Sequence, residues 1–175
     1  MSSFFIITIM ADDRPGLVET LSSIISEHQG NWLESRLTHL AGKFAGIVHL
    51  QVGKSHVEAL RQALQALQQQ GWVINIEHSQ VQEIGTHTPT QMQLNIVGND
   101  RPGIIKEISQ VLSKLGVNVL DLATHFESAA MSAEALFNTQ ARVQLPERLD
   151  EDELRDQLEN LSNDLMVEVK RLTNG

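Results

Sequence analysis

The chain has no cysteine and no long apolar run. Without cysteine, disulfide bonds, thiolate nucleophiles and cysteine-based zinc or iron–sulfur sites are excluded, and a reducing compartment, by default the cytoplasm, is expected. The apolar run near the amino terminus stops at Asp12 and Asp13 and, unlike a signal peptide, has no basic segment before it. No other run approaches the ~20 apolar residues of a membrane span. We therefore expect neither secretion nor membrane insertion.

Positive charge is scarce: 13 lysines and arginines face 22 aspartates and glutamates, for a net charge of −9. Such a charge repels phosphate backbones, and no local cluster of lysines and arginines offsets it. The composition therefore disfavours direct binding to DNA or RNA.

Motifs for catalysis and metal binding are also missing. The chain has no Gly-x-Ser-x-Gly elbow, P-loop or Rossmann glycine pattern, and the acidic run over residues 150–153 is typical of a helix amino terminus. The histidines show neither the i, i+4 pairs nor the HExxH spacing of a helical zinc site. They are His28, His39, His49, His56, His78, His87 and His125. The sequence predicts a non-enzymatic protein without metal or cofactor.

The feature that is present is an internal repeat. Residues 13–17, Asp-Arg-Pro-Gly-Leu, recur 87 residues later as residues 100–104, Asp-Arg-Pro-Gly-Ile. The same offset relates the apolar residues of segment 5–9 to those of segment 92–96, and Asn31 to Asn118. Since residue types match on both sides of the motif, chance is a poor explanation, and we infer a duplicated unit.

Each motif marks the passage from a strand to a helix. Apolar residues alternate over 5–9 and 92–96, as in a strand that buries one face, and recur at helical spacing over 17–25 and 104–112. Pro15 and Pro102 suit the first helical turn. Asp13 and Asp100 are expected to cap the free amides of these helices.

The rest of each copy reads as strand, strand, helix, strand. In the first copy the alternating segments end at residues 52 and 76, and a leucine stripe at 60, 64 and 67 marks the second helix. The sequence thus predicts an α+β chain of two ferredoxin-like βαββαβ domains, each a four-stranded antiparallel sheet with two helices on one face. We place the domains at residues 1–84 and 91–175, with a polar linker over 85–90.

The two copies differ in two places. The second hairpin is longer by about six residues, within 127–134, which is either a tolerated insertion or a contact to a partner or ligand. The sheet face away from the helices carries Phe4, Ile6 and Ile47 in the first copy, where the second has Gln91, Gln93 and Asn95 on its first strand. We expect the apolar face to be covered, either by a segment of the same chain or by a second subunit in a homodimer.

With the two Asp-Arg-Pro-Gly motifs and the turn over residues 116–119, Gly-Val-Asn-Val, the chain resembles the ACT domain family over nearly its whole length. The resemblance implies small regulatory modules that bind an amino acid at an interface between two domains, near the first strand–helix loop. The residues implied as ligand-binding are Asp12, Asp13, Arg14, Gly16, Asn31, Asn99, Asp100, Arg101, Gly103 and Asn118.

The chemistry of these residues suits a zwitterion. Helix amides next to Gly16 or Gly103 favour a carboxylate, and the aspartates can pair with an ammonium group. The same motif also builds a strand–helix junction without any ligand, and both readings stay open. Because Trp32 follows Asn31 directly in the first copy, we favour the second copy for binding.

Within the family, the chain resembles bacterial transcriptional regulators made of two such domains. That resemblance implies indirect control of transcription through a DNA-binding activator of the LysR type, with glycine as the effector. The alternative is a regulatory subunit that binds an amino acid and controls a metabolic enzyme.

Overall fold

The computed structural model describes residues 2–79, 90–128 and 135–172. The expected linker over 85–90, apart from Thr90, and most of the longer hairpin over 127–134 lie outside the described residues. The chain forms two compact units, residues 1–83 and 84–175, and each is described by itself.

The first unit runs β1 (Ser2–Asp12), α1 (Leu17–Glu27), β2 (Asn31–Leu40), β3 (Lys43–Gly53), α2 (Val57–Ala66) and β4 (Val73–His78), with short 3-10 turns on either side of α2. The second runs β5 (Gln91–Asn99), α3 (Ile104–Lys114), β6 (Asn118–Ser128), β7 (Ala135–Gln144), α4 (Glu151–Glu159) and β8 (Met166–Arg171). The sheet orders are β2-β3-β1-β4 and β6-β7-β5-β8, with antiparallel neighbours. The predicted tandem of ferredoxin-like halves is confirmed.

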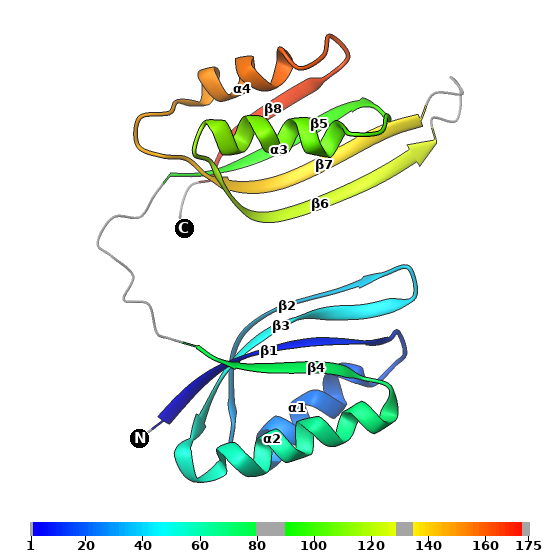
Figure 1. The fold of residues 1–175 in the computed structure, drawn as a ribbon, viewed down its shortest axis with the longest axis vertical. Coiled ribbons are helices and arrows are strands. Elements are labelled where there is room, and N and C mark those ends of the chain that lie inside the picture. Colours follow the sequence, from blue (N-terminus) through cyan, green and yellow to red (C-terminus); the bar gives the residue numbers. More distant parts are fainter. Residues whose placement is uncertain (1, 80–89, 129–134, 173–175) are drawn as a thin grey trace. The chain divides into compact units, whose positions relative to one another are not determined.

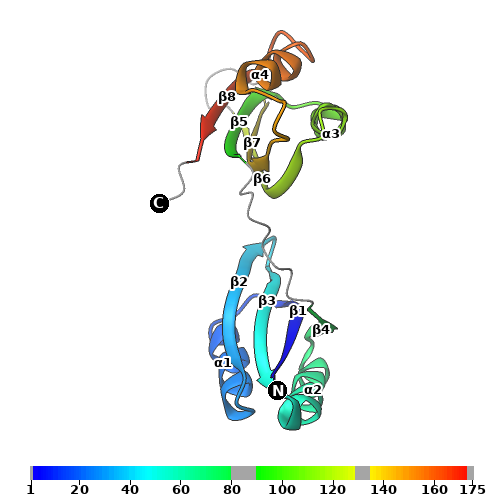
Figure 2. The same cartoon turned by 90° about the vertical axis from the view of Figure 1, so that its left-hand side faces the viewer.

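In each unit both helices cover the same face of the sheet (Figures 1 and 2). The alternation along β1 buries Phe5, Ile7 and Ile9 under the helices, and the leucines of α2 meet them, with Leu64 only 1% exposed. The second unit repeats this around Leu94 on its central strand. The two cores share no residue, so each unit has the means to fold around its own apolar cluster.

The helix starts differ from the sequence prediction. Helices α1 and α3 begin at residues 17 and 104, and their caps are Gly16 and Gly103, with φ of 91° and 92° and no side-chain cap hydrogen bond. Both prolines therefore precede the helices, and the expected capping by Asp13 and Asp100 is wrong. The reason is that glycine adopts the left-handed conformation freely and turns the chain into the helix without a polar cap.

The edge strands β2 and β6 each contain a bulge at the same place in the repeat. The pairing register shifts between Trp32 and Glu34, and again between Val119 and Asp121. The extra residue is a leucine in both, and Leu33 and Leu120 stay 42% and 39% exposed. A bulge bends an edge strand and disrupts its ladder locally.

Candidate functional site

The loop between β1 and α1 closes one end of the first sheet. The Asp13 amide donates to the Gly42 carbonyl at 2.9 Å, which ties the loop to the β2–β3 turn. Lys43 donates a hydrogen bond to the Asp12 carboxylate, and this bond lowers the pKa of Asp12. His39 lies 3.9 Å from the Asp13 carboxylate. The two aspartates thus each face a basic side chain of the β2–β3 hairpin.

The matching loop of the second unit, between β5 and α3, is held by a different pair. Arg101 forms two hydrogen bonds to the Glu107 carboxylate, at 2.8 and 2.5 Å, and both side chains are about a third exposed. These bonds lower the pKa of Glu107 and raise the pKa of Arg101. Asp164 accepts a hydrogen bond from the Asn99 amide at 3.3 Å. Of the candidate residues here, Asp100 has no described side-chain partner.

The first unit has no counterpart of the Arg101–Glu107 pair. Thr20 occupies the position equivalent to Glu107 and donates both its hydroxyl and its amide to the Gly16 carbonyl, each at 2.9 Å. Among the described residues, no ion pair or hydrogen bond engages the Arg14 guanidinium. The two loops therefore offer different charges: in the first an arginine whose charge helps to lower the pKa of Asp12, and in the second an aspartate without a described side-chain partner.

Both loops end on open helix amides. The first intrahelical bond of α1 runs from Thr20 to Gly16, so the amides of residues 17–19 have no intrahelical acceptor. A Cβ built on Gly16 or Gly103 would meet nothing within 4 Å. In α3 the Ile104 amide donates to the Arg101 carbonyl at 3.3 Å, and the first intrahelical bond runs from Glu107 to Gly103. Amides without an intrahelical acceptor and the helix dipole both favour an anion at such a helix start.

The candidate asparagines lie elsewhere. Asn31 and Phe4 both pair with Gln51, which places Asn31 at the opposite end of the sheet from Asp12. Eight residues of strand separate the two levels, or about 26 Å at 3.3 Å per residue. Asn118 has the same placement relative to Asn99 in the second unit. Within one domain, the asparagine and the loop cannot hold the same small ligand.

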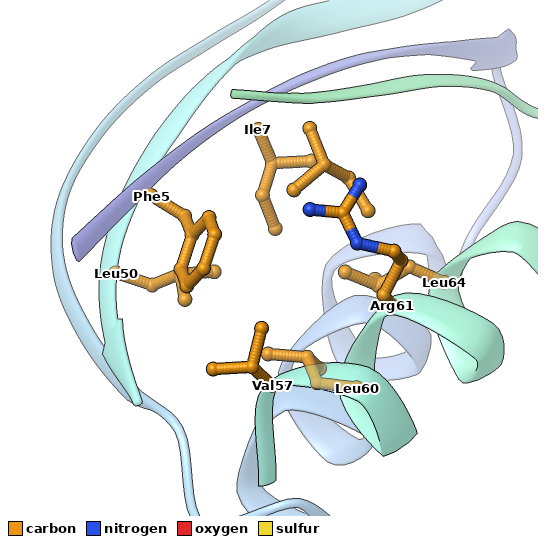
Figure 3. A pocket seen from close by; sticks show the side chains of 8 residues that line it. Phe5, Ile7, Leu50, Val57, Leu60, Arg61 and Leu64 are labelled. Carbon is orange, nitrogen blue, oxygen red and sulfur yellow. The ribbon is translucent and has the colours of Figure 1, made fainter. Parts of the chain in front are cut away.

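Trp32, the residue directly after Asn31, packs partly buried against the first core. The cavity between α2 and the sheet is too small for a ligand. It encloses about 10 Å³, room for a single water, among apolar side chains with Arg61 as the one polar lining residue (Figure 3).

No group of three histidine, aspartate or glutamate side chains that could hold a metal occurs within the described residues. In the same part of the chain, no helix has the length and apolar character needed to cross a membrane.

The family model for the ACT domain matches the chain twice, over residues 3–76 and 90–171. The chain belongs to the ACT domain family. Each match spans one βαββαβ unit and includes its strand–helix loop, so both copies of the Asp-Arg-Pro-Gly motif lie inside an ACT domain. A search of curated proteins found no match.

Two solved structures align with this ACT tandem over its full length. A crystal structure of an unknown protein from Galdieria sulphuraria has a TM-score of 0.81 at 24% identity and covers 99% of this chain and 100% of its own. A crystal structure described as a putative glycine cleavage system transcriptional repressor has a TM-score of 0.71 at 15% identity and covers 99% of both chains. At these identities the likeness shows a shared two-domain fold.

Proposed function

We propose that this ACT protein is a non-catalytic, amino-acid-responsive regulator whose ligand binds at the strand–helix loops, residues 12–17 and 99–104. One observation carries the proposal: in both units, helix amides without an intrahelical acceptor follow a glycine at which a Cβ would meet nothing within 4 Å. An α-carboxylate accepts hydrogen bonds from such amides, and the dipole adds to the attraction.

The loop side chains support a zwitterion rather than a simple anion. In the second unit, the free Asp100 carboxylate lies next to the helix start and can pair with an ammonium group. In the first unit, Arg14 adds a cation for the carboxylate. A small amino acid such as glycine carries both an ammonium and a carboxylate group and needs no side-chain pocket, which agrees with a cavity of only about 10 Å³ at the first core.

Control of transcription through another protein is the second part of the proposal. The solved structure described as a glycine cleavage repressor shares the two-domain fold, and the net charge of −9 disfavours direct contact with DNA. We therefore propose that the chain binds a DNA-bound activator of the LysR type, and that glycine weakens this contact.

Calorimetry on the full chain with glycine, serine and the branched-chain amino acids tests the ligand. We expect heat with glycine, and Asp100→Asn should weaken binding about tenfold, because a hydrogen bond to a charged group contributes about 1.5 kcal/mol or more. Asp156→Asn, which removes an exposed charge on α4, is the matched control and should bind like the wild type. If no amino acid gave heat, the proposal that the chain responds to an amino acid would be refuted.

Affinity purification from the native cell, with and without glycine, tests the partner. Recovery of a DNA-binding activator that is released by glycine supports transcriptional control. Recovery of a metabolic enzyme in its place would move the proposal to enzyme regulation.

A further inference from the structure

We propose that two copies of this chain associate through the outer face of the first sheet, the face turned away from α1 and α2. Residues that pair across neighbouring strands lie at the same level of the sheet, and their pairing defines this surface. Thr8 at its centre pairs with Ile47 and Asn75, Ile6 with His49 and Glu77, and Met10 with Ala45 and Val73. This set, together with Phe4, is called the outer face below.

Six of the ten residues of the outer face are apolar, beside the polar Thr8, His49, Asn75 and Glu77. Met10, Ile47 and Val73 are 43%, 46% and 60% exposed, and all three lie within two levels of one another across three strands. The ring of Phe4 lies 6.0 Å from that of His49, which extends the apolar surface along β1. Contiguous apolar surface of this kind on a folded unit marks an interaction site.

The second unit is an internal control for this argument. At the levels of Phe4, Ile6 and Thr8 it carries Gln91, Gln93 and Asn95, with Arg142 and Lys170 beside Gln93 and Gln140 and Glu168 beside Asn95. At these three levels the same fold therefore forms with polar side chains, whereas Val97 and the 66% exposed Met166 keep the level of Met10 and Val73 apolar in the second unit as well. Phe4, Ile6 and Ile47 of the first unit are thus not needed to build its sheet, and we take them as the mark of a partner.

A second copy of the same face is the partner that fits best. Three strands with about five outward residues each and β4 with about three, spaced about 4.8 Å apart, present about 600 Å² per copy. Two copies then bury about 1,200 Å², the lower end for a stable interface. The second unit's outer face is polar at the levels of Phe4, Ile6 and Thr8, so it matches this surface less well. In a two-fold pairing the same patch meets itself, and apolar surface then covers apolar surface.

Sedimentation equilibrium of the full chain from micromolar to hundred-micromolar concentration tests the pairing. The wild type should reach twice the 19.5 kDa mass of one chain. The triple variant Phe4→Gln, Ile6→Gln, Ile47→Gln uses the residues of the second unit and should stay monomeric with an unchanged circular dichroism spectrum. Val18→Gln, which removes a 48% exposed apolar side chain from α1, should leave the dimer intact. A monomeric wild type, or a triple variant that still dimerises, would overturn the proposal.

The absence of cysteine allows the interface to be located directly. Thr8→Cys puts one thiol at the centre of the outer face, where two packed sheets are about 10 Å apart, within the reach of a short bis-maleimide. We expect cross-linked dimers with Thr8→Cys and none with Val18→Cys. Cross-linking of the second variant alone would place the contact on the helices and overturn the proposal.

Discussion

Replacing Gly16 by alanine separates backbone strain from crowding at the start of α1. Gly16 has a φ of 91°, and a Cβ there would meet nothing within 4 Å, so the substitution adds strain without a clash. The left-handed conformation costs an L-residue about 1–2 kcal/mol, and the smaller unfolded-state entropy of alanine returns about 0.4–1 kcal/mol. We expect a net loss of about 1 kcal/mol from the free energy of unfolding of the first unit.

Tryptophan fluorescence during urea unfolding measures this loss selectively, because Trp32 and Trp72 both lie in the first unit. With a denaturant slope of about 1–2 kcal/mol per molar for a small domain, the midpoint should fall by about 0.5–1 M. Gly53→Ala is the control within the unit, since Gly53 has an ordinary φ of −63°, and it should not lower the midpoint. Gly103→Ala strains only the second unit and should leave the fluorescence midpoint unchanged. An unchanged midpoint for Gly16→Ala, or an equal loss for Gly53→Ala, would refute the reasoning.

Two further predictions concern the second unit and use far-UV circular dichroism. Arg101 lowers the pKa of Glu107 below the ordinary 4.5, so their pair should stabilise the wild type relative to Glu107→Gln from neutral pH down to about that value. This margin should fade as the pH falls through the lowered pKa, and a margin that does not change between neutral and acid pH would contradict this. Asp150 accepts a hydrogen bond from the Glu153 amide at 2.7 Å as the cap of α4, so Asp150→Ala should cost about 1 kcal/mol in urea unfolding, whereas Asp156→Asn on the same helix should cost much less.

The fold was predictable because burial on one face leaves a period in the sequence. The first core lies between β1 and α2. It buries Phe5, Ile7 and Ile9 of the strand and the leucines of the helix, so both segments show a regular spacing of apolar residues in the sequence. Because the unit is repeated, the same spacing of apolar residues occurs a second time in the second unit. The helix caps were not predictable from the motif, because proline and aspartate suit both a first helical turn and the loop before it, and only the φ of Gly16 decides between them.

The sequence was enough to predict which loops form the candidate site, but not which side chains lie together there. Sequence offset alone aligned Asn31 with Asn118, yet both lie at the far end of the sheet because β1 and β2 run parallel. The Arg101–Glu107 pair depends on a loop that folds back onto its helix, and no periodic pattern reports such a contact. The bulge at Leu33 is likewise a single extra residue that leaves no period in the sequence.

A titration of the ¹⁵N-labelled full chain with glycine, followed by two-dimensional NMR, tests the central claim most directly. Binding at the strand–helix loops predicts shifts of the backbone amides within residues 12–20, 99–107, or both, with signals elsewhere in the cores unchanged. Spectra that do not change at millimolar glycine, or that change only away from these two segments, would contradict the account.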